Sequence, residues 1–571
     1  MNFSLNLFFK LALIILPSSF AAAQLPEDPL LNIVEDEFKR EWTELQELSQ
    51  PPYFMSYVIN DIHTASVSSS FGSLTGSYQN HGRLSLVDVK VGDYAFDSSH
   101  PLKSYDDIDF SESPHNQGYG RSLVIDNNKE AIQYQLWQST EQAYKVALET
   151  FKALKNSRVN PDKKTVHDFS RETSSVYVEE PLPDFAGFYN KKSWEDRMKK
   201  FTAPFLSNKN IVTSDATLES GTERKYFISS EGSKIAQNRT YAYLSISASV
   251  RAVDGDVVPL HLSYFAFNPG ELPSDEAILK DVNTLISKLE MLRSAPVAEP
   301  YTGPAILHAR AAGVFFHEIF GHRVEGHRLK SEHDGQTFKE KINQVVLPKT
   351  LSVISNPTLS NYNGQALNGH YRFDDEGVKG QKVTIVEDGV LKSFLMSRSP
   401  IENFPNSNGH GRAQAGASPV TRQSNLVIEN KKEVPMSDLR KMLISECKKQ
   451  KRTYGYLFMD VIGGFTTTDR TMPNAFNIFP TEVYRIYVDG RPDELVRGVD
   501  LIGTPLAMFA GIVAADKKSE VFTGYCGAES GSVPVTAISP SLFVRRIETQ
   551  RKSTMEVEST ILDRPQSPSN K

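Results

Sequence analysis

The stretch FFHEIFGHRVEGH, residues 315–327, places three histidines and two glutamates within thirteen positions. Two histidines that share a zinc ion on one helix face are usually four residues apart. His317 and His322 are five residues apart, a spacing that puts them roughly 140° from each other around a regular helix axis. The stretch therefore predicts a metal site only if the helix is distorted between these two residues.

Gly321 lies directly before the second histidine and tolerates such a distortion. A π-bulge, or a kink at Gly321, would let both imidazoles reach one ion. The spacing alone leaves a second interpretation open, in which the histidines are ordinary hydrogen-bonded residues of an amphipathic helix. The charged residues of this segment also have a simpler interpretation, in which they form the solvated end of the helix. They are Arg323, Glu325, His327 and Arg328.

A catalytic zinc ion needs three protein ligands and one open position for water. The sequence leaves the third ligand open among Glu325, His327, His370, His410 and Cys526. Glu318, next to the first histidine, is the expected general base for a water molecule that the metal activates.

The first residues predict export. Lys10 precedes the apolar run Leu11–Ile15, and small residues follow at Ala21 and Ala23. This pattern is typical of a secretory signal, residues 1–23, cleaved after Ala23, so we expect a periplasmic or secreted protein. We find no later apolar run that is long enough to span a membrane.

Charge and cysteine content exclude other classes. A net charge of −6 over 571 residues gives no reason to expect nucleic acid or an anionic membrane as a partner.

The two cysteines exclude a disulfide framework, although a single disulfide between Cys447 and Cys526 remains an alternative in an exported protein. Cys447 has helical apolar spacing and is expected in a core, whereas Cys526 lies in a glycine-flanked loop. The glycines of NSNGHGRAQAG lack the strand, helix and lysine of a phosphate-binding loop.

The pattern of elements predicts an α+β protein with a mixed N-terminal domain, residues 24–295, and a sheet-rich C-terminal domain, residues 296–555, that carries the metal-binding helix. Residues 556–571 are expected to form a flexible tail. Residues 127–156 and a segment capped by Ser274 predict helices, and residues 241–267 predict two strands. Beyond a Pro-rich boundary, a helix is expected from about Ala305 through the quoted motif. Two Asp-Gly pairs, at residues 388–389 and 489–490, predict tight hairpins.

HEIFGH followed by RVEGH, together with the distant TGYCGAESGSVPV, resembles the TldD/PmbA family of metallopeptidases and its catalytic TldD-like branch. The family motif is HExxxH, usually continued as GHxxEGD, with a cysteine in a GxCGxxGxSVPV loop. The segments DDEG, SNGHGR, PVTRQSN, GGF and IGTP also match family landmarks in the same order. The resemblance is strong in the C-terminal half and weak in the N-terminal half.

The resemblance implies that His317, His322 and Cys526 bind one Zn²⁺ per chain and that Glu318 is the catalytic base. Two imidazoles and a thiolate are an acceptable ligand set for zinc, although iron or manganese could use similar ligands. His327 replaces the usual aspartate and could alter a hydrogen bond near the metal. His410, Arg412 and Arg422 lie in family segments and are candidates for binding the substrate.

The family likeness further implies a dimer with an enclosed site that admits unfolded or extended peptides. A homodimer is the simpler expectation, although some relatives pair with a paralogous subunit that has lost the metal motif. The leading hypothesis is an exported zinc-dependent peptidase. The alternative is a non-catalytic peptide-binding or partner subunit, which the presence of Glu318 and all three ligands disfavours.

Overall fold

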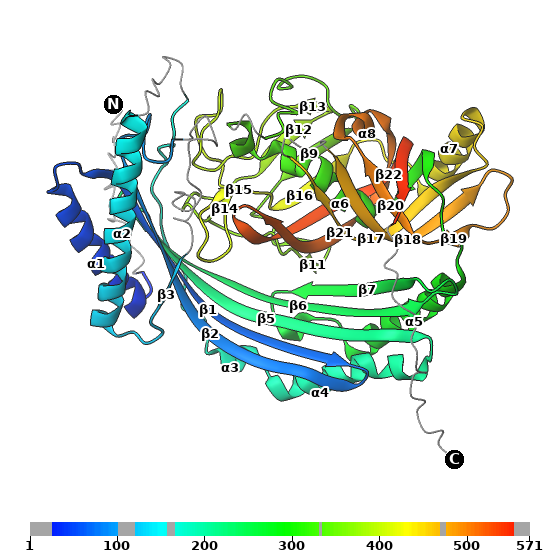
Figure 1. Cartoon of the computed structure of the whole chain (residues 1–571), viewed down its shortest axis with the longest axis horizontal. Helices are drawn as coiled ribbons and strands as arrows, with labels where there is room; N and C mark the ends of the chain where they lie inside the picture. The colour runs from blue at the N-terminus through cyan, green and yellow to red at the C-terminus, as the bar shows by residue number, and fades with distance from the viewer. Residues whose placement is uncertain (1–24, 101–119, 157–165, 331–333, 469–474, 553–571) are drawn as a thin grey trace, which may run out of the picture.

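The structure is a computed structural model that describes residues 25–100, 120–156, 166–330, 334–468 and 475–552 (Figure 1). Two large sheets, each packed against helices, confirm the predicted α+β class. The predicted signal, residues 1–23, and the predicted tail, residues 556–571, lie outside the described residues. Within the described ranges, no helix combines the length and the apolar character needed to cross a membrane.

The N-terminal part is built on one long, mostly antiparallel sheet. In the described residues it has seven strands in the order β3-β2-β1-β5-β6-β4, with β7 pairing β6. The strands are β1 (Pro52–Ser70), β2 (Ser73–Val91), β3 (Arg121–Leu123), β4 (Val176–Val178), β5 (Ile211–Ser229), β6 (Lys234–Arg251) and β7 (Val257–Ala266). The alternation predicted for residues 241–267 is confirmed, because Ala242, Leu244 and Ile246 of β6 are buried on one face.

Helices cover that buried face of the sheet. They are α1 (Pro29–Gln46), α2 (Lys129–Asn156), α3 (Phe185–Phe188), α4 (Lys191–Thr202) and α5 (Asp275–Ser294). The core joins Trp194 of α4 and Val282 of α5 to Leu244 of β6. The predicted cap of α5 is confirmed, since Ser274 Oγ accepts a hydrogen bond from the amide of Ala277 at 3.3 Å.

The opposite face of the sheet turns toward the C-terminal part of the chain, which lies above it in Figure 1. Gln237 Nε2 on β6 donates a hydrogen bond to the carbonyl of Phe373 at 2.8 Å. Tyr243, also on β6, packs edge-on against Tyr525 with ring centroids 6.0 Å apart. The N-terminal sheet is therefore in direct contact with the C-terminal part.

The C-terminal part contains a mixed sheet that curls back on itself. Its described strands follow the order β13-β12-β9-β16-β22-β20-β18-β17-β8, with β19 on β18 and β21 on β22, and β22 also pairs β8. The strands are β8 (Tyr301–Leu307), β9 (Leu351–Ser355), β12 (Val383–Glu387), β13 (Val390–Leu391), β16 (Asn425–Asn430), β17 (Tyr454–Thr466), β18 (Phe476–Tyr487), β19 (Glu494–Val496), β20 (Val499–Gly503), β21 (Ile512–Ala528) and β22 (Gly531–Arg551). Two short ladders pair β10 (Asn361–Tyr362) with β11 (Gln365–Ala366), and β14 (Gly411–Arg412) with β15 (Val420–Thr421).

The helices of this part are α6 (Ala309–Ile319), α7 (Met436–Lys449) and α8 (Pro505–Gly511). Helix α6 is buried along its length except at Arg310. Its apolar residues, among them Val314, Phe315 and Phe316, belong to the C-terminal core.

Two local predictions are wrong. The helix begins at Ala309 instead of near Ala305, because residues 301–307 form strand β8 between β17 and β22.

Of the two predicted Asp-Gly hairpins, the first is confirmed: β12 and β13 flank Asp388 and Gly389, whose φ values are 49° and 80°. The second is not tight, because β18 ends at Tyr487 and its partner β19 begins only at Glu494.

We expect the contact between the two parts to depend on Arg398. Its guanidinium donates to both carboxylate oxygens of Glu231, at 2.7 and 2.8 Å, and the side chain is only 2% exposed. Replacing Arg398 with Ala removes the cationic partner of Glu231 and leaves its carboxylate only the hydrogen bond from the Tyr94 hydroxyl, so the free energy of unfolding should fall by about 3–5 kcal/mol in guanidinium titrations.

The matched control is Arg372→Ala. Arg372 pairs with Glu179 across the same boundary at 3.1 Å but is 61% exposed. A solvent-exposed pair of this kind contributes about 0–1 kcal/mol. Equal losses for the two variants would contradict the importance of the buried contact.

Candidate metal centre

His317 and His322 converge because the α-helix ends between them. Helix α6 ends at Ile319, and a 3₁₀ turn, Gly321–Val324, follows after Phe320. The two imidazole rings are thereby brought to 5.0 Å between centroids, nearly perpendicular to each other. The expected π-bulge or kink is replaced by helix termination and a tighter turn.

Gly321 fits this turn for a steric reason. A Cβ atom at residue 321 would lie 1.8 Å from Oε1 of Gln423, whose Nε2 donates a hydrogen bond to the His317 carbonyl at 3.3 Å. The sequence correctly identified Gly321 as the point of distortion. The close approach of Gln423 is a through-space constraint that the local sequence does not contain.

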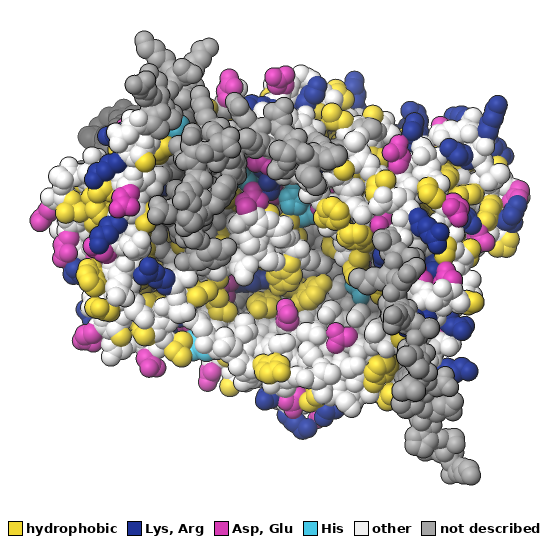
Figure 2. Space-filling model, in the orientation of Figure 1, with side chains coloured by type: hydrophobic (Ala, Val, Ile, Leu, Met, Phe, Trp, Pro, Cys, Tyr) yellow, Lys and Arg dark blue, Asp and Glu magenta, His cyan; other side chains and the backbone are white. Residues whose placement is uncertain are grey.

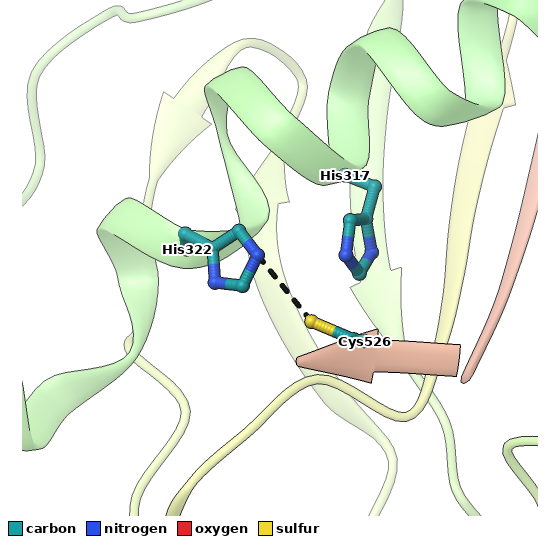
Figure 3. A group of neighbouring side chains, drawn as sticks. All are labelled: His317, His322 and Cys526. Atoms are coloured by element: carbon teal, nitrogen blue, oxygen red, sulfur yellow. Dashed lines mark hydrogen bonds between the residues drawn. The ribbon is translucent and has the colours of Figure 1, made fainter. Parts of the chain in front are cut away.

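Cys526 comes from strand β21, which pairs with β22 next to the turn that joins them. Its Sγ lies 3.4 Å from Nε2 of His322, and Figure 3 shows the sulfur directed toward the space between the two imidazoles. The ligand atoms of His317, His322 and Cys526 all lie within 4.8 Å of one another. The structure therefore brings together the three predicted ligands from the end of α6, the 3₁₀ turn after it and strand β21, which is about two hundred residues away in sequence.

Neighbouring charges shift the pKa values of two of the predicted ligands. Burial opposes ionisation of Cys526, but the positive charges of His322 and His317 outweigh it and hold the pKa of the thiol well below its ordinary value. Burial likewise opposes protonation of His322, yet Glu325 and the Cys526 thiolate raise its pKa well above the ordinary value. A thiolate with two imidazole nitrogens fits the ligand preferences of zinc.

Glu325 orients His322 from behind. Its carboxylate is fully buried and accepts hydrogen bonds from His322 Nδ1 at 3.2 Å and from Arg328 Nε at 2.9 Å. Burial works against ionisation of Glu325, but His322 and Arg328 lower its pKa to about 2. Because Nδ1 is engaged in this way, Nε2 of His322 faces Cys526.

Glu318, the predicted base, lies beside the ligands. One of its carboxylate oxygens is 4.0 Å from Nε2 of His322. Burial raises the pKa of Glu318 despite the lowering effect of His317 and His322. Gly464 of β17 makes room for it, because a Cβ atom there would lie 2.9 Å from Cγ of Glu318.

The cluster opens into a cavity of about 490 Å³ between the N-terminal sheet and the C-terminal part. Its walls include residues 462–466 of β17 and residues 522–528 of β21. The N-terminal sheet contributes Tyr243, His261 and Ser263. Figure 2 shows hydrophobic side chains around the hollow between the two parts.

The three residues proposed to bind the substrate do not line this cavity. His410 is fully buried, and its Nε2 lies 3.0 Å from Ser355 Oγ. Arg412 is also buried and donates to the carbonyl of Gln423. Arg422 Nη1 donates to Ser530 Oγ and to the Gly531 carbonyl, both at 2.9 Å, and Nη2 bonds the Cys526 carbonyl. Arg422 thus connects the backbone of Cys526 on β21 to the turn that follows it.

The remaining predicted candidates have other positions. His327 Nε2 lies 2.6 Å from Oε1 of Glu529, which itself lines the cavity. His370 Nδ1 bonds the Pro357 carbonyl at 2.9 Å. Both cysteines are free thiols, which excludes the alternative of a disulfide between them, and Cys447 is buried in a core with Leu439 and Leu443 as expected.

Sequence reasoning did not identify Glu325 as the partner of His322, or Arg422 as the support of Cys526. The spacing of Glu325, three residues after His322, was a usable signal, because a carboxylate close behind a histidine ligand is a common arrangement in metal sites. No signal in the sequence indicated that Tyr243, His261 and Ser263 would reach the cavity.

Comparisons with known proteins relate this chain to proteins named metalloproteases. Residues 300–551 match the PmbA/TldA metallopeptidase C-terminal domain. A protein of Archaeoglobus fulgidus named metalloprotease is 32% identical over 243 residues, which are 42% of this chain and 51% of the relative. The zinc metalloprotease TldD homolog of Saccharolobus solfataricus is 25% identical over 336 residues, 57% of this chain and 68% of the relative.

A solved structure, that of TldE from Thermococcus kodakarensis, has a TM-score of 0.59 at 14% identity and covers 92% of this chain and 100% of its own. At that identity the likeness concerns the fold alone. The chain spans about half the length of the A. fulgidus relative and of a Methanocaldococcus jannaschii metalloprotease, 51% and 47%.

Two histidines and a cysteine beside a glutamate thus lie at the wall of a cavity, within the residues that match the PmbA/TldA metallopeptidase C-terminal domain. The C-terminal part of the chain, residues 300–551, is a domain of the TldD/PmbA family.

We expect Glu325→Gln to weaken metal binding without removing a ligand. The neutral amide no longer balances the charge of His322 or fixes its ring as strongly, so the Kd for zinc should rise about 10–100-fold. Competition with a chromophoric chelator measures this change. Glu429→Gln, at an exposed position of β16, is the control and should leave the Kd unchanged.

A second prediction concerns the pH dependence of thiol labelling in chelator-treated protein. Because the pKa of Cys526 is lowered, it remains a thiolate as the pH falls, and its rate of alkylation should change little between about pH 8 and about pH 6. An ordinary thiol would slow about tenfold per pH unit in the same range. Burial raises the pKa of Cys447 to about 11, so it should not be labelled in the native protein.

The control for this experiment is His322→Ala, which removes the larger of the two charges that lower the pKa of Cys526. Labelling of this variant should regain a steep pH dependence. Steep dependence in the unsubstituted protein would contradict the electrostatic description of the site.

Proposed function

We propose that this protein is an exported zinc-dependent peptidase that hydrolyses peptide bonds in unfolded or extended polypeptides. The observation that carries the proposal is the convergence of His317, His322 and Cys526 beside Glu318 at the wall of one cavity. The likeness to relatives named metalloproteases, one of them a zinc metalloprotease, supports it.

His317, His322 and Cys526 would hold the metal. When bound, a zinc ion in such a ligand set supplies Lewis acidity toward a carbonyl oxygen and lowers the pKa of water. The three ligands come from an α-helix end, a 3₁₀ turn and a strand, all buried, so their positions are rigid.

Glu318 would move the protons. Its carboxylate faces the cavity beside the ligands, and burial raises its pKa toward the range in which a carboxylate accepts and returns a proton efficiently. In this role it takes a proton from the attacking water and passes it to the leaving amine. General acid–base groups of this kind contribute about 10²–10⁴-fold to rate.

The backbone at the cavity suits an extended peptide. Within the described residues, β21 pairs only with β22 between Ser519 and Ala528, and β17 pairs only with β18 beyond Phe458. On β21 the carbonyls of Gly524 and Cys526 already accept hydrogen bonds from Asn368 and Arg422, so we propose that a substrate segment adds as a strand to the edge of β17 at residues 462–466. Main-chain pairing of this kind requires an extended or unfolded segment and does not depend on a particular side-chain sequence.

Export and assembly are part of the proposal. The N-terminal pattern ending at Ala23 supports a periplasmic or secreted location. A homodimer is proposed because this chain carries a complete ligand set and Glu318, so a partner subunit need not supply any of them. The structural likeness to a TldE protein keeps a paralogous partner as the second arrangement to test.

The test compares the mature protein with its Glu318→Gln variant. We expect both proteins to bind one zinc ion at His317, His322 and Cys526, because Glu318 is not a ligand. The variant should hydrolyse an unfolded, casein-like substrate about 10²-fold more slowly, or slower still. Metal content and substrate hydrolysis are the two measurements. Glu429→Gln, an exposed change on β16, should keep both properties.

Equal hydrolysis by the Glu318→Gln variant would remove Glu318 from the mechanism. An inactive unsubstituted protein that lacks metal under zinc-replete conditions would favour a binding subunit instead of an enzyme.

A further inference from the structure

A second group of potential metal ligands lies on the other face of the N-terminal sheet. Asp61 and His63 are on β1, and His81 is on β2. This is the face covered by α3 and α4, which lie on the side of the sheet away from the C-terminal part (Figure 1). The group is therefore separated from the cavity of the first site by the sheet itself.

The strand register brings these three residues together. His63 is directly opposite His81 in the antiparallel pair, and Asp61 lies two residues before His63 on the same face. The two imidazole rings are stacked, with centroids 3.7 Å apart and planes inclined by 15°. His81 Nε2 lies 2.7 Å from Oδ1 of Asp61, and one ligand atom from each residue lies within 4.8 Å of the others.

Arg83 fixes the carboxylate of Asp61. Its Nε and Nη2 donate to Oδ2 at 3.0 and 2.6 Å, which leaves Oδ1 directed at His81. Arg83 is itself anchored, because Nη1 donates to the Val124 carbonyl at 2.9 Å and Nη2 to Asn127 Oδ1 at 3.2 Å. One oxygen of Asp61 is thus held in place beside two imidazoles, as a metal site requires of its carboxylate ligand.

The second histidine is held in a similar way. The ring of His63 lies between that of His81 and that of Phe185, the first residue of α3, whose centroid is 5.7 Å away. The side chains of His81 and Asp61 are 31% and 16% exposed. The group is therefore partly exposed, and because the two ring planes are nearly parallel, one ring must turn about its Cβ–Cγ bond for both imidazoles to direct a nitrogen at the same ion.

We propose that Asp61, His63 and His81 form a second metal site, specific for a divalent late transition-metal ion such as Zn²⁺, Cu²⁺ or Ni²⁺. Two imidazole nitrogens and one carboxylate oxygen are ligands that such ions accept, whereas Mg²⁺ and Ca²⁺ prefer oxygen ligands alone. The site has no sulfur ligand and differs in this respect from the Cys526 site.

The effect of an ion here would be structural. His63 and His81 belong to adjacent strands, so an ion bound by both connects β1 to β2 across the ladder. An ion that binds only the folded state shifts the folding equilibrium toward it. The second site would therefore stabilise the long β1–β2 pair without taking part in peptide hydrolysis.

The test measures metal stoichiometry and cobalt spectra of the mature protein and three variants. After equilibration with micromolar free zinc, the unsubstituted protein should hold two ions per chain and His81→Asn one. Cobalt in the Cys526 site should give an intense sulfur-to-metal charge-transfer band, which His81→Asn keeps. Cys526→Ser should lose that band and still hold one ion at the second site.

The control is His167→Asn, at an exposed histidine outside both groups, which should keep two ions. If His81→Asn does not fold, zinc protection of His63 and His81 from diethylpyrocarbonate in the unsubstituted protein provides an independent measurement. One ion per chain in both the unsubstituted protein and His81→Asn, or no protection by zinc, would overturn the second site. Loss of the cobalt band in the unsubstituted protein would instead overturn the first site, so the two failures are distinguishable.

Discussion

The structure depends on the end of one buried helix. Residues five apart on a continuous α-helix point in different directions, and His317 and His322 share a site because α6 ends between them. Gly321 admits the sharp turn, and the side chain of Gln423 fills the space that a Cβ atom would take. Glu325 then aligns the second imidazole from behind. The irregular spacing is thus a property of a helix terminus and not a defect in a helical motif.

The N-terminal and C-terminal parts of the chain meet at the cavity beside this helix end. The C-terminal sheet curls around α6 and supplies Cys526 from β21, while Arg422 fixes the turn beyond it. The N-terminal sheet closes the cavity from the other side, and its two faces have different roles. One faces the cavity through Tyr243 and His261, and the other carries helices and the group formed by Asp61, His63 and His81.

Much of this could be predicted from local sequence. Periodicity gave the strands around residues 241–267 and the cap at Ser274, because both depend on neighbours in the chain. The three ligands and Glu318 followed from the motif and from the family resemblance. The start of α6 was misplaced because an apolar run fits a buried strand as well as a helix. Arg422 was predicted as a substrate-binding candidate, but its contact with the Cys526 backbone and the wall of the cavity could not be predicted, since they depend on contacts between segments more than a hundred residues apart.

The central claim is that two imidazoles and one thiolate bind the same ion. X-ray absorption at the zinc edge, recorded on the purified protein whose second group has been disabled by His81→Asn, measures that ligand set directly. The account predicts one sulfur at about 2.3 Å and nitrogen scatterers at about 2.0–2.1 Å, with the sulfur contribution lost in a further Cys526→Ser change. A shell of nitrogen and oxygen only, with Cys526 present and reduced, would contradict it.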